Sequence, residues 1–125
     1  MMKIFYRASC ASSKKALAWF RSHDIEIEAI RIGEITHKDL IQILSLSENG
    51  VFDIVKRSNS VAADENNKHR EKLNNMKFNE ALVYLKGHPA LLATPIILDP
   101  TKCLIGFNSE QIRQFIPIKH RKSLR

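Results

Sequence analysis

The chain has 125 residues, of which 44% are hydrophobic, so it is long enough to bury one core without disulfide or metal staples. Its 20 basic and 13 acidic residues give a net charge of +7, which favours acidic partners, although the basic run at 119–125 is equally typical of a solvated tail. Two cysteines exclude a disulfide framework. We find no secretory signal and no apolar run long enough to cross a bilayer, so we expect a cytoplasmic protein with no membrane partner.

The first part of the chain has a β-α-β pattern. Residues 4–6 are a short apolar run typical of a buried strand, and residues 14–23 place apolar side chains on one face of a helix. Residues 25–32 alternate apolar and charged side chains, which indicates a second strand.

The middle of the chain, residues 34–90, is mainly helical in pattern, which indicates an insertion. Thr36 can cap a helix through Asp39, residues 51–55 suggest a second short helix, and residues 78–85 predict an amphipathic third.

Within this insertion the composition shifts at residues 58–75. This segment is polar, rich in asparagine and almost free of large apolar side chains. We expect a loop with a marginal helix, which could become ordered only on a partner.

The last part of the chain predicts a hairpin and a helix. Residues 94–98 and 103–106 are two short strands joined by a turn at 99–102. Asn108 is suited to cap a final helix, with Gln111 at its third position in a capping-box arrangement.

The combined order, β-α-β followed by β-β-α, predicts an α/β protein with a thioredoxin/glutaredoxin-like fold, a mixed four-stranded sheet and an inserted helical lobe. We expect a single domain with its core at 1–33 and 91–118, the helical insertion at 34–90 and a basic tail at 119–125.

Cys10 is the strongest candidate for chemistry. It lies between a strand and a helix, where unpaired backbone N–H groups and the charges of Lys14 and Lys15 favour the thiolate. Thioredoxin-like redox sites carry a second cysteine three residues later, but this chain has Ser13 there, so no disulfide can form between positions 10 and 13. Cys10 is either a reactive thiol that exchanges with a small thiol such as glutathione, without a second cysteine, or a residue that has lost its redox role. Cys103 lies in an apolar strand pattern and is expected to be a buried hydrophobe.

Thr94 and Pro95 are the second candidate site. In thioredoxin-like folds a cis-proline at this point packs against the redox cysteine, so we expect Pro95 to be cis and to line the site with Thr94. The alternative is an ordinary proline at the start of a strand. The histidines and carboxylates show no metal-ligand spacing and no glycine-rich phosphate loop is present, so neither a metal nor a cofactor is expected.

Taken together, these motifs resemble the Spx regulators (suppressor of ClpP and ClpX), which are relatives of glutaredoxin-type arsenate reductases. The resemblance covers nearly the whole chain and rests on Ser9-Cys10-Ala11-Ser12-Ser13-Lys14-Lys15-Ala16, Leu46-Ser47-Glu48-Asn49-Gly50, His88-Pro89-Ala90-Leu91-Leu92, Thr94-Pro95-Ile96-Ile97-Leu98-Asp99, Gly106-Phe107-Asn108 and Phe115-Ile116-Pro117.

The resemblance implies a transcription regulator that binds the C-terminal domain of the RNA polymerase α subunit. The helical lobe would make this contact through Ser45, Glu48, Asn49 and Gly50, of which the glycine is the essential one. The resemblance also implies that promoter DNA is bound only together with polymerase, that promoter choice changes under oxidative or other stress, and that an adaptor and a protease control the amount of protein.

The chain departs from the family pattern at three positions. Ser13 removes the resolving cysteine, and Ser45 replaces a basic residue of the regulators. Thr94 replaces the arginine that helps to hold the oxyanion in arsenate reductases, and a neutral hydroxyl cannot replace bidentate guanidinium binding. The alternative function, an arsenate-reductase-like monothiol oxidoreductase using Cys10, is therefore second to the regulator. A free-standing DNA-binding protein using the basic tail is a third alternative.

Overall fold

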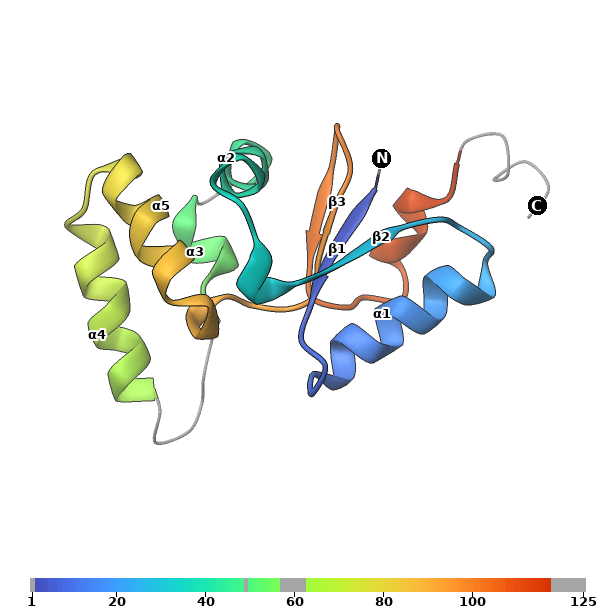
Figure 1. Cartoon of the computed structure of the whole chain (residues 1–125), viewed down its shortest axis with the longest axis horizontal. Helices are drawn as coiled ribbons and strands as arrows, with labels where there is room; N and C mark the ends of the chain where they lie inside the picture. Colours follow the sequence, from blue (N-terminus) through green and yellow to red (C-terminus); the bar gives the residue numbers. More distant parts are fainter. Residues whose placement is uncertain (1, 49, 57–62, 118–125) are drawn as a thin grey trace.

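The computed structural model describes residues 2–48, 50–56 and 63–117, and for residues 63–67 it describes the backbone only. A central sheet separates two groups of helices (Figure 1). None of the helices in these described ranges is long and apolar enough to cross a membrane.

The sheet has four strands in the order β2-β1-β3-β4. β1 (Lys3–Tyr6) pairs in parallel with β2 (Glu28–Arg31), and the helix α1 (Ala11–Ser22) connects the two strands. β3 (Ile96–Leu98) pairs antiparallel with β1, and β4 (Cys103–Ile105) pairs antiparallel with β3. The predicted mixed four-stranded sheet is confirmed, with each strand shorter than its sequence pattern except β1.

The two faces of the sheet bury two different clusters, because successive side chains of a strand point to opposite faces. Ile4, Ile97 and Leu104 pack with α1 and with the 3₁₀ helix η3 (Gln111–Phe115). Phe5 and Ile96 face the other way and pack against the helices of the insertion.

The insertion begins after β2 and the short η1 (Ile32–Glu34), and its described residues form the α-helices α2 (His37–Ser45), α3 (Val51–Ile54), α4 (Ala63–Asn74) and α5 (Phe78–Gly87). It ends at η2 (Pro89–Leu91). Together, α2–α5 form the helical lobe on one side of the sheet (Figure 1).

The predicted cap of α2 at Thr36 is confirmed, and the structure completes it as a reciprocal capping box with Asp39. The Thr36 Oγ1 accepts from the Asp39 backbone N–H at 3.1 Å, and Asp39 Oδ2 accepts from the Thr36 N–H at 3.2 Å. The Lys3 Nζ donates to Asp39 Oδ1 at 3.1 Å, which joins the lobe to β1. Burial opposes ionisation of Asp39, but the hydrogen bonds from Thr36 and Lys3 outweigh it and lower the pKa of this carboxyl.

The helix expected within residues 58–75 is present as α4, but with 12 residues it takes up most of the segment that was expected to be a loop. Tertiary contacts anchor it: Leu73 is buried to 2% exposure, the Arg70 guanidinium lies over the Phe52 ring of α3, and His69 hydrogen-bonds the Tyr84 hydroxyl of α5. A few contacts of this kind are enough to order a segment whose residues have modest intrinsic helix propensity. Residues 58–62 of the predicted loop lie outside the described part of the chain.

Two other predictions need correction. The first helix begins at Ala11 rather than at residue 14, with Cys10 as its N-cap residue, because the small residues at 11–13 join the first turn. The final helix is the short 3₁₀ helix η3 rather than an α-helix, and it begins at Gln111 with Glu110, not Asn108, as its N-cap residue. Asn108 Oδ1 accepts from the N–H groups of Glu110 and Gln111 at 2.9 Å each, which tightens this turn before η3 can extend as a longer helix.

Candidate functional site

Cys10 lies at the point where the chain leaves β1 and enters α1. Its backbone N–H donates to Arg7 O at 3.1 Å, and its carbonyl accepts from Lys14 N at 3.1 Å, which begins the helix. The side chain therefore stands at the first turn of α1, where the helix dipole favours a negative charge.

The fold brings the four predicted residues of the thiol site together. The Cys10 thiol donates to the carbonyl of Thr94 at 3.6 Å across 84 positions of sequence. The Thr94–Pro95 peptide bond is cis, as the sequence predicted. Ser13 is fully buried and lies one turn along α1 from Cys10.

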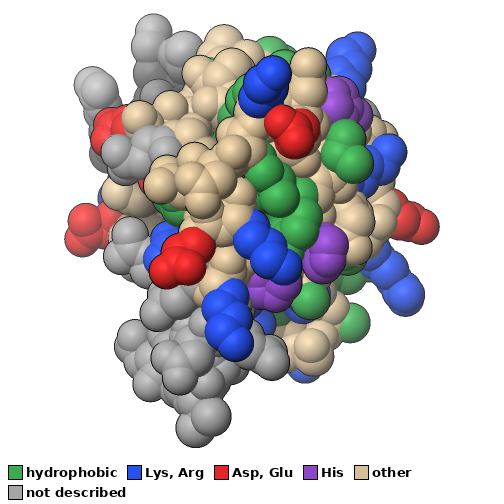
Figure 2. Space-filling view, turned by 90° about the vertical axis from the view of Figure 1, so that its left-hand side faces the viewer, with side chains coloured by type: hydrophobic (Ala, Val, Ile, Leu, Met, Phe, Trp, Pro, Cys, Tyr) green, Lys and Arg blue, Asp and Glu red, His purple; other side chains and the backbone are tan. Residues whose placement is uncertain are grey.

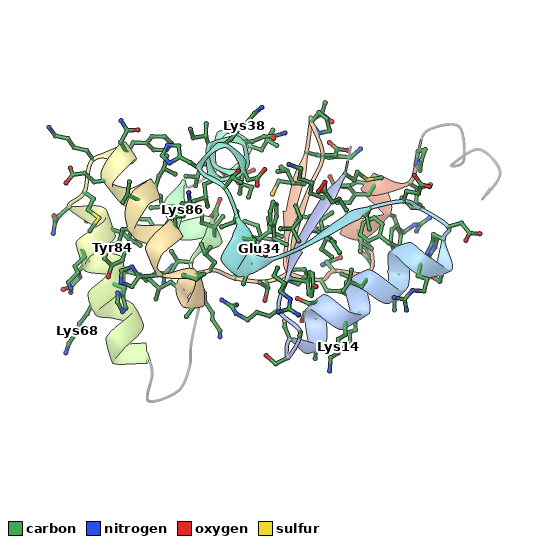
Figure 3. All side chains as sticks on the ribbon, viewed as in Figure 1. Lys14, Glu34, Lys38, Lys68, Tyr84 and Lys86 are labelled. Carbon is green, nitrogen blue, oxygen red and sulfur yellow. The ribbon has the colours of Figure 1, made fainter. Side chains whose placement is uncertain are left out.

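The Cys10 thiol has a pKa lowered to about 7. Burial opposes the charged form, but hydrogen bonds from the side-chain hydroxyls of Ser13 and Thr94 and from the backbone N–H groups of Ser12 and Ser13 outweigh it. Lys14 was expected to contribute through its charge, but its exposed side chain points away from the sheet (Figure 3), and hydrogen bonds lower the pKa instead.

Ser13 supports the thiolate but cannot resolve an oxidised sulfur. Its Oγ accepts from the Arg7 backbone N–H at 3.3 Å, which leaves the hydroxyl proton available for the sulfur of Cys10. A serine at this position therefore keeps the thiol acidic without allowing an internal disulfide.

Cys103 is a free thiol like Cys10, but its pKa is shifted in the opposite direction. It is half-buried on β4, and burial raises the pKa of its thiol to about 12. It therefore stays protonated at neutral pH and acts as a small hydrophobic side chain, although at the edge of the sheet rather than at its centre.

We expect the reactivity of Cys10 towards iodoacetamide to rise with pH around a midpoint near 7, because only the thiolate reacts. Replacing Ser13 with alanine removes a hydrogen bond to the thiolate and should move this midpoint upward. Mass spectrometry of each cysteine follows the reaction, and Cys103 provides an unreactive internal control. An unchanged midpoint in Ser13→Ala would contradict this account of the thiolate.

Arg7 belongs to the site but was missed in the sequence. Its guanidinium donates to Leu92 O at 2.8 Å, to Thr94 Oγ1 at 3.4 Å and to Pro89 O. It thus ties the end of β1 to the segment before the cis-proline. An arginine three residues before the cysteine was the only signal, and it does not reveal contacts with residues more than 80 positions away.

The predicted partner-binding residues do not all lie together. Ser45 and Gly50 line one apolar groove of about 380 Å³, beside Ile41 and Phe78, which are 42% and 52% exposed. Glu48 instead lines a separate cleft next to β4. Asn49 lies outside the described residues.

Gly50 is the residue of this groove with the most unusual backbone. It is the N-cap of α3 with φ 68° and ψ −140°, a conformation that side chains with a Cβ rarely adopt. A Cβ added there would meet no atom within 4 Å, so space beside the glycine is open.

The outer face of the lobe shows hydrophobic side chains between Lys, Arg and His side chains (Figure 2). Here His69, Tyr84 and His88 form a ring cluster in which Tyr84 and His88 stack with centroids 4.2 Å apart. His88 Nδ1 is bonded to Tyr84 O at 2.8 Å, and these contacts join α4 to the end of α5. Among the residues that the structure describes, no group of three or more His, Cys, Asp or Glu side chains could hold a metal ion.

The fold and the Cys10 site define a thioredoxin-like protein with one acidic thiol and an added helical lobe. Known structures with this fold include a putative ArsC family related protein from Bacteroides fragilis, 23% identical, with a TM-score of 0.74 over 90% of this chain and 95% of that one. An arsenate reductase from Vibrio cholerae is 19% identical, with a TM-score of 0.73 over 92% of this chain and 97% of that one. At these identities the likeness concerns the fold alone.

Comparison of sequences identifies the family more specifically than comparison of folds does. The ArsC family profile matches residues 5–115. The global transcriptional regulator Spx of Streptococcus pneumoniae is 35% identical over 98% of this chain and 90% of its own length. Spx 1 of Lactococcus lactis is 34% identical over 98% of this chain and 94% of its own length. The chain belongs to the ArsC family and, within it, to the Spx regulators, and these relatives support a regulatory role.

Proposed function

We propose that this protein is an Spx-like transcription regulator that binds the C-terminal domain of the RNA polymerase α subunit through its helical lobe. By doing so it alters promoter choice during oxidative or other stress. The observation that carries the proposal is that Ser45 and Gly50 share an exposed apolar groove with Ile41 and Phe78. Apolar side chains gathered on a surface mark a protein-binding site more often than isolated ones do.

The groove suits a folded partner for a physical reason. Gly50 has no side chain, so a partner's backbone can approach α3 closely at this point. Burying the exposed parts of Ile41 and Phe78 would supply hydrophobic stabilisation, while the polar side chain of Ser45 lies at the same groove.

The remaining parts of the proposal follow from this contact. Promoter DNA is engaged only with polymerase, and the protein works in the cytoplasm, where an adaptor and a protease set its amount. Any control by oxidation acts through Cys10 alone, because Ser13 replaces the resolving cysteine three residues later. Oxidation would then yield a mixed disulfide with a small thiol or another protein.

The second candidate function is a monothiol oxidoreductase of the arsenate-reductase type, favoured by the Cys10 pKa of about 7. Thr94 in place of an arginine argues against it. Arg7 does not restore that arginine, because its guanidinium already donates to Leu92 O and Pro89 O.

Calorimetric titration of the full chain with the isolated C-terminal domain of the α subunit tests the regulator. We expect saturable binding that Cys10→Ala leaves within about twofold, because Cys10 contacts Thr94 and not the groove. The matched control is Cys103→Ala, which removes the other thiol. Absence of binding, together with arsenate-dependent oxidation of glutathione that needs Cys10, would contradict the regulator and support the enzyme.

A further inference from the structure

The strand β4 is an open edge of the sheet. It pairs with β3 on one side, and no other described strand pairs with it. Backbone hydrogen bonds show which of its groups are free to pair. Asp99 N donates to Lys102 O at 2.9 Å and Gly106 N donates to Pro95 O at 2.7 Å, so the even-numbered residues of this strand face β3. Because antiparallel pairing alternates along a strand, the N–H and C=O groups of Cys103 and Ile105 point away from the sheet.

The two edges of the sheet differ in how they are protected. The β2 edge carries Glu28 and Arg31, and charged side chains of this kind discourage the addition of another strand. The β4 edge reads Cys103-Leu104-Ile105 and has no charged residue. The β4 edge is therefore protected against the addition of another strand only by its short length.

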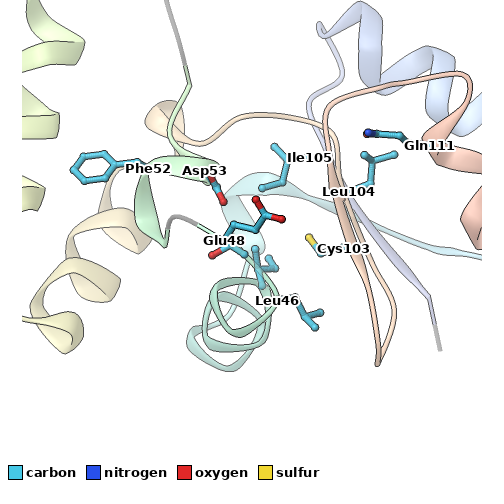
Figure 4. Close-up of a pocket in the computed structure, with 10 residues that line it drawn as sticks. Leu46, Glu48, Phe52, Asp53, Cys103, Leu104, Ile105 and Gln111 are labelled. Atoms are coloured by element: carbon cyan, nitrogen blue, oxygen red, sulfur yellow. The ribbon is translucent and has the colours of Figure 1, made fainter.

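A cleft of about 460 Å³ adjoins this unprotected edge, between β4 and the helical lobe. Its lining combines apolar side chains, including Leu46, Phe52 and Ile105, with the carboxylates of Glu48 and Asp53. In Figure 4, the sulfur of Cys103 and the side chain of Ile105 point from β4 towards the two acidic residues, whereas Leu104 lies towards Gln111 on the other side of the strand. Two carboxylates are notable on a chain whose net charge is +7.

We propose that β4 and this cleft bind an extended, basic peptide segment of a partner protein, which adds to the sheet as a further strand. Its backbone pairs with Cys103 and Ile105, and two alternate side chains on one face of the added strand enter the cleft: an apolar one, and a Lys or Arg that meets Glu48. Main-chain hydrogen bonds supply affinity in this mode of recognition, and alternate side chains supply specificity.

A second copy of this chain fits the site poorly. In a symmetric pair, each β4 edge would bring its own Glu48 and Asp53 towards those of the other copy, and like charges would meet. The site is also distinct from the groove at Gly50, because the two share no lining residue. The proposal therefore goes beyond polymerase binding and does not depend on it.

NMR titration of the full chain with the synthetic peptide Ac-KTVTK-NH2, in which the Lys and Val side chains share one face of an extended strand, tests the proposal. We expect saturable amide shifts at residues 103–105 and 52–53, with a Kd on the order of 1 mM, a range typical of a short peptide without preorganisation. The acidic peptide Ac-ETVTE-NH2 should bind at least about fivefold more weakly, since it meets Glu48 with like charge.

Two variants separate the backbone and charge contributions. Ile105→Pro removes an N–H that points away from β3, and Ile105→Ala is its control because it loses the side chain but keeps the N–H. We expect Ile105→Pro to bind about fivefold more weakly than Ile105→Ala. If Ile105→Pro does not fold, Glu48→Gln, expected to bind about threefold more weakly, is compared with Glu34→Gln on an exposed 3₁₀ turn outside the cleft lining.

Three results would overturn the proposal. One is equal binding of the acidic and basic peptides, and another is a set of shifts centred on β2 instead of β4. The third is a dependence of the β4 shifts on protein concentration without peptide, which would assign the edge to a second copy.

Discussion

Replacing Gly50 with arginine is expected to weaken binding to the C-terminal domain of the α subunit by at least about 100-fold, which corresponds to roughly 2.7 kcal/mol. The backbone at Gly50 has φ 68°, so any side chain there strains the start of α3. The long arginine side chain would also occupy space at the groove that Ile41 and Phe78 line and would keep the partner from approaching. Calorimetry with the wild-type chain as reference measures the loss.

The matched control is Gly50→Ala. It introduces about the same backbone strain, of order 1 kcal/mol, but its methyl group points into open space and cannot cover the groove. It should keep most of the binding. Equal losses in both variants would assign the effect to the backbone of α3 rather than to the groove, and wild-type affinity in Gly50→Arg would remove the lobe from the proposed interface.

Replacing Asp39 with alanine is expected to lower the free energy of unfolding by about 2 kcal/mol at pH 7. About half of this is the lost hydrogen bond from the Thr36 backbone N–H to the Asp39 carboxylate in the capping box of α2, and the rest is the lost charged hydrogen bond with Lys3. Chemical denaturation measures the difference. The control Lys3→Ala keeps the cap and should cost less, because Lys3 is about one-third exposed.

This effect has a defined pH dependence. The folded-state pKa of Asp39 is lowered, so its contribution is full above the unfolded value of about 3.9 and is lost as the pH falls through the folded value. The gap between wild type and Asp39→Ala should therefore shrink only below about pH 4. A gap that is constant down to the acid limit would mean that the ionised carboxylate contributes nothing.

Local signals predicted much of the fold correctly. The capping box of Thr36 and Asp39 and the apolar runs of the strands depend on residues a few positions apart. The cis-proline at position 95 was predicted through the fold class rather than through its neighbours. Predictions failed where local preference is weak: α4 has modest propensity and many polar side chains, and its order comes from Leu73 and from contacts with α3 and α5.

In the thiol site, too, some features could be predicted from neighbouring residues and others could not. Cys10 at the start of a helix and Ser13 one turn later are properties of neighbouring residues, and they alone indicate an acidic thiol without a partner cysteine at position 13. Arg7 reaches Leu92 and Thr94 only because β1 and the segment before β3 come together in the sheet.

The sequence by itself thus determined the strand and helix order, the single acidic thiol and the family, because these depend on short-range pattern and on similarity along the chain. Only the tertiary structure decided that Ser45 and Gly50 share a groove while Glu48 lies beside β4. The physical reason is that grooves and open edges are made by elements distant in sequence, whose packing is set by the burial of the whole core rather than by any local run of residues.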